Sequence, residues 1–158
     1  PFEGFGIGGS FGEKDMRNVV RWAVSGLPEH KPRHLLGIGT INDIFTAVKE
    51  GVDVFDCVIP TREARHAMVY TRAGRLGITK ASFKTDRKKL DAGCTCYVCK
   101  RGMTRKELRE LFKSDRLSAQ RAATVHNIVF FKRLMAEIRE AINKGTLEKL
   151  EKAYYNGR

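Results

Sequence analysis

Three cysteines, Cys94, Cys96 and Cys99, stand within six residues of one another. Thiols this close cannot all pair as disulfides, but they suit one tetrahedral ion with sulfur and nitrogen ligands, which favours zinc. Buried or redox-active thiols are the alternative. A fourth ligand is needed, and His126 is the strongest candidate, ahead of His30, His34, His66 and Cys57. Three thiolates and one imidazole leave no position for water, so we expect one structural zinc per chain.

Asp56 is the second residue whose position could serve chemistry. It follows the apolar run Val-Asp-Val-Phe at residues 52–55, and basic residues follow a few positions later. A carboxylate at the end of a strand can act as a nucleophile or as a general base. A turn or helix-capping role is the alternative.

The elements that would position Asp56 alternate in type along the first third of the chain. The pattern predicts strands at residues 5–8, 34–38 and 52–55, and helices at 15–27, starting from Asp15, and at 41–50. This alternation is typical of a parallel sheet, either open and doubly wound or part of a (β/α) barrel. In both folds the chemistry lies at the carboxyl ends of the strands, which here are Gly8-Gly9, Leu36-Gly37 and Asp56.

Beyond Pro60 the pattern changes to short strand-like pieces, with a turn at residues 72–75, and then to the cysteine cluster. Helical periods return at 104–113 and 117–144, and Gly145 is a suitable end for the longer helix. Its predicted buried stripe is Ala122, Val125, Val129, Leu134, Ile138 and Ile142. We therefore predict three parts: a βα region (1–60), a basic metal-binding insertion (61–116) and C-terminal helices packing on both (117–158).

The net charge of +12 is concentrated in one segment, since residues 62–113 hold 15 basic and 5 acidic side chains. Such a block indicates a polyanionic partner, most often nucleic acid, or else a solvated basic face. Aromatic residues are sparse there, which favours phosphate contacts over base stacking. No run is apolar and long enough to cross a membrane, and no secretory signal is visible, so we expect a cytoplasmic protein.

Two motifs together carry a family resemblance. The run Phe-Asp-Cys-Val-Ile-Pro-Thr-Arg at residues 55–62, and Cys-x-Cys-x2-Cys followed after 26 residues by His126-Asn127, resemble the bacterial-type tRNA-guanine transglycosylases, or queuine tRNA-ribosyltransferases. The likeness extends from Gly8 to about Gly145 and corresponds to the C-terminal part of a longer enzyme. It implies the last three strands of a (β/α)8 TIM barrel with a zinc-binding insertion, in a homodimer with the zinc region near the interface.

The resemblance also implies roles for individual residues. Asp56 would attack C1′ of the wobble guanosine in the tRNA anticodon loop, and a 7-deazaguanine such as preQ1 or queuine would then displace it. The walls of the base pocket would include Gly8, Gly9, Leu36 and Gly37. The anticodon loop would be held by Gly37, Ile38, Gly39, Thr40, Ile41, Asn42, Asp43, Thr61, Arg62, Glu63, Ala64 and Arg65.

The chain departs from the family pattern at two places and lacks a third feature. Gly-Gly-Ser-Phe-Gly-Glu at residues 8–13 is one residue shorter than the usual Gly-Gly-Leu-Ala-Val-Gly-Glu, and Leu36 replaces a Met. The general acid/base aspartate of the family belongs to an N-terminal half without a counterpart here. Because the sequence starts at Pro1 and is patterned from the outset, we expect a fragment. Three strands are too few to close a barrel, so we expect the fragment to be inactive alone.

Two rival functions belong to other classes. A zinc-stabilised accessory subunit could bind tRNA without catalysis, but such a partner would be expected to lack the nucleophile, and Asp56 is present. A doubly wound oxidoreductase would carry the dinucleotide fingerprint, and the glycines at residues 6–12 do not form it with an acidic residue about 20 positions on.

Overall fold

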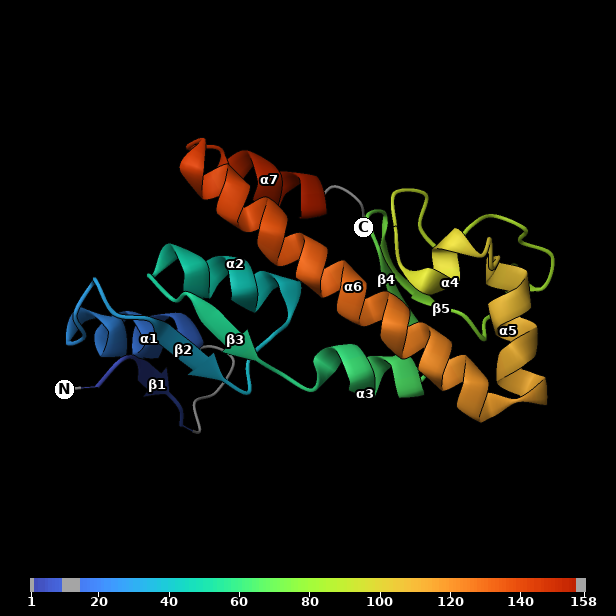
Figure 1. The fold of residues 1–158 in the computed structure, drawn as a ribbon, viewed down its shortest axis with the longest axis horizontal. Helices are drawn as coiled ribbons and strands as arrows, with labels where there is room; N and C mark the ends of the chain where they lie inside the picture. Colours follow the sequence, from blue (N-terminus) through green and yellow to red (C-terminus); the bar gives the residue numbers. More distant parts are fainter. Residues whose placement is uncertain (1, 10–14, 156–158) are drawn as a thin grey trace. The chain divides into compact units, whose positions relative to one another are not determined.

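A computed structural model of the chain describes residues 2–9 and 15–155. The chain divides into two compact units, residues 1–59 and 60–158, whose elements are labelled in Figure 1. The residues Ser10, Phe11, Gly12 and Glu13, which carry the departure from the family's glycine motif, lie outside the described part.

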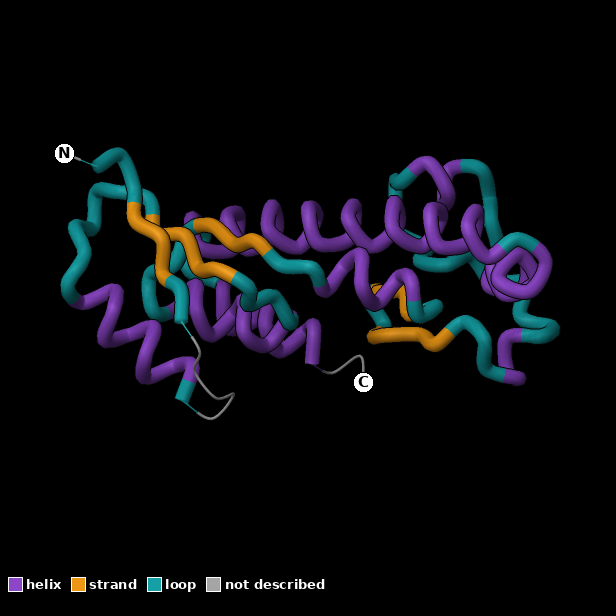
Figure 2. The backbone as a smooth tube through the Cα atoms, turned by 90° about the horizontal axis from the view of Figure 1, so that it is seen from below, coloured by secondary structure: helices purple, strands orange, loops and turns teal. Residues whose placement is uncertain are grey.

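The first unit is a small parallel sheet with helices between its strands. The strands β1 (Phe5–Ile7), β2 (Arg33–Leu36) and β3 (Val54–Asp56) pair in that order, and all pairs are parallel. The helices α1 (Met16–Ser25) and α2 (Ile41–Lys49) connect them. Figure 2 shows the three strands side by side. The predicted parallel βα alternation is therefore confirmed.

The two faces of this sheet differ in burial. Ile7 and Leu35 point into a core that they share with the helix residues Met16, Val20 and Ala47. The alternate strand residues point the other way, and there Leu36 and Val54 are 43% and 46% exposed. Because side chains alternate along a strand, His34 and Asp56 lie on this same open face.

The helices of the first unit begin in different ways. Thr40 caps α2, since its hydroxyl accepts a hydrogen bond from the Asp43 amide at 3.2 Å. Asp15 occupies the N-cap position of α1, as predicted, but its side chain makes no capping hydrogen bond.

The second unit starts within a helix that the sequence pattern did not predict and that begins one residue earlier. Helix α3 (Ile59–Arg65) carries Pro60 in its first turn, where the missing amide hydrogen costs nothing. A hairpin of β4 (Met68–Thr71) and β5 (Gly74–Gly77) follows, and its two-residue loop falls inside the predicted turn. The short 3-10 helix η1 (Ala81–Phe83) comes next.

Four helices complete the second unit. The one-turn α4 (Tyr97–Lys100) follows the first two cysteines, and α5 (Arg105–Ser114) starts with a capping box of Thr104 and Glu107. The long α6 (Arg116–Asn143) and then α7 (Leu147–Tyr155) end the described chain. No helix of the described residues is long and apolar enough to cross a membrane.

The buried stripe of α6 differs from the predicted one. Leu134 and Ile138 are buried as expected, but Val125 and Ile142 are 40% and 50% exposed. The buried side instead carries Ala119, Ala123, His126, Asn127, Phe130, Phe131, Leu134, Ile138 and Ala141. The prediction followed the apolar residues, whereas the helix also buries the polar His126 and Asn127, which both have hydrogen-bond partners in the core.

Candidate functional site

The predicted metal ligands come together in the second unit. One ligand atom from each of Cys94, Cys96, Cys99 and His126 lies within 4.8 Å of the others, and all four residues are buried. The Nδ1 atom of His126 lies 3.3 Å from the Cys99 sulfur and 3.7 Å from the Cys96 sulfur. Ligands at zinc bond lengths of about 2.0–2.3 Å would be separated by about 3.5 Å, so these spacings fit a tetrahedral zinc.

The hairpin selects which nitrogen of His126 faces the thiols. Its Nε2 lies 2.7 Å from the carbonyl oxygen of Tyr70 in β4, and a carbonyl only accepts, so Nε2 carries the hydrogen. Nδ1 is then left with its lone pair directed at the sulfur atoms. A ligating histidine is commonly oriented by such a second hydrogen bond.

The electrostatics of the cluster also favour a cation. Burial raises the pKa of the Cys94 and Cys99 thiols and lowers the pKa of His126. Three thiolates without a counter-ion would therefore be unfavourable, whereas a bound divalent ion stabilises the deprotonated sulfurs. The backbone amide of Cys99 also donates to the Cys96 sulfur at 3.4 Å. The donor set thus fits zinc, held by four protein ligands.

Asn127, the residue after the histidine ligand, ties three segments together. Its Oδ1 accepts from the Tyr70 amide, and its Nδ2 donates to the carbonyls of Pro60 and Met68, each at 3.0 Å. The side chain is fully buried. Adjacent residues of α6 thus serve the metal cluster and hold the hairpin and α3 in place.

A second link joins α6 to the loop before the cysteines. Arg133 donates to the Asp91 carboxylate at 2.7 Å and to the Gly93 carbonyl at 2.6 Å. The carbonyl of Asp91 in turn accepts from the Cys94 amide at 3.1 Å. This charged pair positions the first cysteine against the helix that carries His126.

Asp56 occupies the carboxyl end of β3 on the open face of the parallel sheet. Its side chain is 62% exposed, and its Oδ1 lies 3.1 Å from Nε2 of His34 in β2. Its backbone carbonyl accepts from the Gly37 amide at 3.0 Å, which joins the ends of β2 and β3. The carboxylate is therefore accessible while the backbone beneath it is held.

Two of the predicted base-pocket residues lie against each other. A Cβ added to Gly8 would lie 3.1 Å from Cδ1 of Leu36, so the leucine side chain extends over the end of β1. Gly37 adopts a positive φ of 74°, a conformation that favours glycine. Gly9 is exposed beside Gly8. Leu36 and the backbone of Gly37 thus border Asp56 at this end of the sheet, and Gly8 lies against Leu36.

The stretch from Gly37 to Asp43 forms the loop after β2 and the first turn of α2. Its exposed residues are Gly37, Thr40 and Asn42, whereas Ile38 packs on the core. Gly39 is buried, and a Cβ there would lie 2.5 Å from Cβ of Cys57, so only glycine fits. Ile41 is half-buried. The loop therefore presents a short polar rim close in sequence to the strand end.

The stretch from Thr61 to Arg65 lies on α3 and presents its two arginines. Arg62 and Arg65 are exposed, Ala64 is fully buried, and Glu63 pairs with Arg75 at 3.1 Å. Thr61 is half-buried. Gln120 of α6 donates to the Arg65 carbonyl at 3.1 Å, which anchors the helix end. The exposed Arg62 and Arg65 give α3 a cationic surface that a phosphate group could contact.

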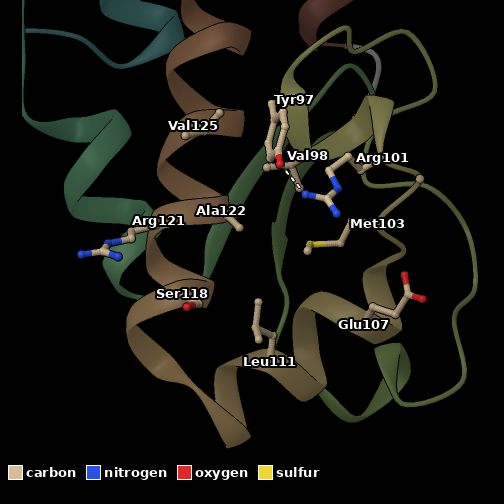
Figure 3. A pocket seen from close by; sticks show the side chains of 11 residues that line it. Tyr97, Val98, Arg101, Met103, Glu107, Leu111, Ser118, Arg121, Ala122 and Val125 are labelled. Carbon is tan, nitrogen blue, oxygen red and sulfur yellow. Dashed lines mark hydrogen bonds between the residues drawn. The ribbon is translucent and has the colours of Figure 1, made fainter.

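A cavity of about 620 Å³ lies in the second unit beside the metal cluster (Figure 3). Its walls come from α4, α5 and α6, with apolar side chains such as Val98, Leu111 and Val125. Tyr97 is 64% exposed at its edge and accepts a hydrogen bond from Arg101, whose guanidinium stacks on the ring at 5.3 Å. An apolar surface of this kind suits a protein partner.

Sequence reasoning missed three residues that the structure connects to these sites. His34 was considered only as a weak metal ligand, and it contacts Asp56 instead. Alternation from Leu36 could have placed His34 on the same face of the strand. Asn127 stands in the motif that carries the family resemblance, but the motif gave it no structural role, and Arg133 gave no signal beyond being a polar residue in a largely apolar helix.

Comparison with known proteins assigns the family. The family model described as queuine tRNA-ribosyltransferase matches residues 1–158. The chain is 42% identical to the queuine tRNA-ribosyltransferase of Nitrosospira multiformis over 156 residues, which are 97% of this chain and 42% of that protein. It is 43% identical to that of Thermoanaerobacter sp. over 98% of this chain and 42% of the relative. The chain thus spans about two fifths of the length of these curated relatives, and it belongs to the queuine tRNA-ribosyltransferase family.

Proposed function

We propose that this chain is the part of a tRNA-guanine transglycosylase that carries the nucleophile and the zinc site. The enzyme exchanges the wobble guanine of tRNA for a 7-deazaguanine, preQ1 or queuine. The observation that carries this proposal is the position of Asp56, an accessible carboxylate at the carboxyl end of a parallel strand, beside Leu36 and Gly37. The names of the relatives support the same reaction.

The three strands are, in this proposal, the last three of a (β/α)8 barrel. Both helices of the first unit share one core with the strands, and the other face exposes the apolar Leu36 and Val54. In a barrel this second face would point inward and be covered by the remaining strands. Active sites of such barrels lie at the carboxyl ends of the strands, where Asp56 stands.

The chemistry is a double displacement at C1′ of the wobble ribose. A carboxylate oxygen of Asp56 forms a bond to C1′ as the C1′–N9 bond of guanine breaks. Guanine leaves with that electron pair and takes a proton from a general acid that we place outside these 158 residues. The incoming base then gives its N9 proton to the conjugate base of that general acid, and its N9 bonds to C1′ as the bond between C1′ and the aspartate breaks. Two inversions amount to retention.

The surroundings of Asp56 fit a flat base and a looped RNA. Gly8, Gly9, Leu36 and Gly37 would border the base, since the glycines let backbone approach a heterocycle closely. The wobble nucleotide would be unstacked to reach Asp56. Residues 37–43 would contact the anticodon loop, and so would residues 61–65, where Arg62 and Arg65 provide phosphate contacts.

The metal cluster has a structural role in this proposal. Zinc bound by Cys94, Cys96, Cys99 and His126 would crosslink the loop before α5 to α6, and a site with four protein ligands has no open position for catalysis. We also propose a homodimer, with the partner near the zinc region. The apolar cavity with Tyr97 at its edge supports an interface there.

The decisive experiment uses a complete enzyme that contains this segment. The Asp56→Asn variant keeps the shape and loses the charge, so it should bind tRNA and form no covalent adduct. Turnover should fall roughly 10³- to 10⁶-fold, as expected for a removed nucleophile. Denaturing electrophoresis of enzyme, tRNA and a trapping base shows the adduct as a slow band. A slow band that persists in the variant would contradict the proposal. If the parent enzyme binds tRNA but forms no adduct, the chain would instead act as a non-catalytic accessory subunit.

A further inference from the structure

The side chain of His34 lies next to the proposed nucleophile, Asp56. Its Nε2 lies 3.1 Å from Oδ1 of Asp56, within ion-pair distance, and this buried nitrogen makes no hydrogen bond within the described residues. In the sheet register His34 is opposite Val54, and Leu36 is opposite Asp56. His34 and Asp56 are thus diagonal neighbours on the open face, within reach of a long side chain.

The two outward side chains of β2, His34 and Leu36, have different neighbours on the open face. The neighbour of His34 in β1 is Gly6, which has no side chain. Leu36 extends over the end of β1, since its Cδ1 is 3.6 Å from the place of a Cβ on Gly6 and 3.1 Å from that on Gly8. The two outward residues of β2 therefore divide the face: Leu36 borders the glycines and His34 contacts the carboxylate.

We propose that His34 is a positioning residue for Asp56, an inference that rests on the proposed function. A small rotation of the His34 ring would direct the Nε2 hydrogen, which has no partner in the described residues, to Oδ1. This bond would restrict the rotation of the carboxylate and leave Oδ2 as the oxygen that bonds to C1′. Asp56 remains 62% exposed, so this contact does not close the site. Holding a nucleophile in its attacking geometry raises the reaction rate, because a misplacement of about 1 Å can lower the rate about 10²-fold. His34 gains and loses no proton in the reaction.

The test compares two substitutions in a complete enzyme that contains this segment. His34→Phe keeps a planar ring without a donor, and His34→Gln offers an amide donor. We expect His34→Phe to lower kcat about 10- to 100-fold with the KM for tRNA nearly unchanged, and His34→Gln to recover most of that loss. The rate of the trapped adduct should fall in parallel with kcat. His30→Gln, an exchange in an exposed loop, serves as the control.

Two outcomes would overturn the inference. The first is a kcat of His34→Phe equal to that of the parent enzyme. The second is an equal loss of kcat in His34→Phe and His34→Gln, because that result would mean that packing of the ring matters and a donor does not. If His34→Phe does not fold, His34→Ala takes its place, with kcat measured with and without added imidazole. Recovery by imidazole supports positioning, and its absence in a folded variant contradicts it. Asp56→Asn separates the two proposals, since an adduct in that variant removes the function itself, whatever His34 does.

Discussion

The two units hold their chemical groups in opposite ways. In the first, Asp56 stands on an open sheet face, and its side chain lies close to the polar side chain of His34. In the second, all four ligands of the metal cluster are buried, and the tautomer of His126 is selected by a backbone carbonyl. In the proposed function, the carboxylate that admits a substrate is the accessible group, and the cluster that only holds an ion is the buried one.

The largest effect should come from removing one metal ligand. Cys99→Ser should abolish stoichiometric zinc binding and destabilise the second unit by an amount on the order of 10 kcal/mol, because structural zinc binding is folding free energy. Elemental analysis should give one zinc in the parent and less than one in the variant. Hydrogen exchange should show lost protection in residues 68–77 and retained protection in β1 to β3.

Cys57→Ser is the matched control for that loss. Cys57 lies in the first unit, next to Asp56, and should be dispensable for metal. An equal loss of zinc in Cys99→Ser and Cys57→Ser would contradict the assignment of the metal site to the second unit. Parent protein that contains no zinc after purification without chelator would contradict it too.

The next effect concerns a buried polar side chain of the enclosed unit. Asn127→Ala removes hydrogen bonds to three backbone groups of α3 and β4. We expect a loss of about 3 kcal/mol in the free energy of unfolding, since buried unsatisfied groups cost about 1–3 kcal/mol each and part of this relaxes. Urea unfolding measures it. Asn143→Ala, at an exposed position of the same helix, should stay within about 0.5 kcal/mol.

A smaller effect is expected beneath the open site. Gly39→Ala would place a Cβ 2.5 Å from Cβ of Cys57, which requires the loop after β2 to move. The expected cost is about 1–3 kcal/mol, typical of overpacking, together with lower turnover in the complete enzyme. The double variant with Cys57→Gly should regain part of the stability. Gly26→Ala, where the nearest atom is 3.8 Å away, is the control and should be close to neutral.

The smallest effect concerns phosphate contacts on α3. Arg62→Ala and Arg65→Ala should each weaken tRNA binding modestly and reduce the slope of log affinity against log salt by about one, as for one lost phosphate contact. Fluorescence titration at several salt concentrations measures the slope. Arg17→Ala, which removes an exposed ion pair with Glu50 in the first unit, should leave it unchanged. Unchanged slopes in all three variants would remove α3 from the RNA surface.

Much of the local structure could be predicted, because its causes are local. Thr104 with Glu107 begins α5 and Gly145 follows α6, since capping depends on a few adjacent residues. Helix α3 was missed because its seven residues are too few for a clear period. The buried side of α6 was misjudged because hydrophobicity alone does not reveal which polar residues have partners in the core.

The sequence by itself determined the βα alternation, the cluster of three thiols and the family, since these follow from spacing along the chain. Only the tertiary structure decided that Nδ1 of His126 faces the thiols, that Asn127 holds the hairpin, and that His34 contacts Asp56. The physical reason is that each of these contacts joins residues more than 20 positions apart, at distances near 3 Å. Contacts of that length depend on strand register and helix rotation, which arise from packing.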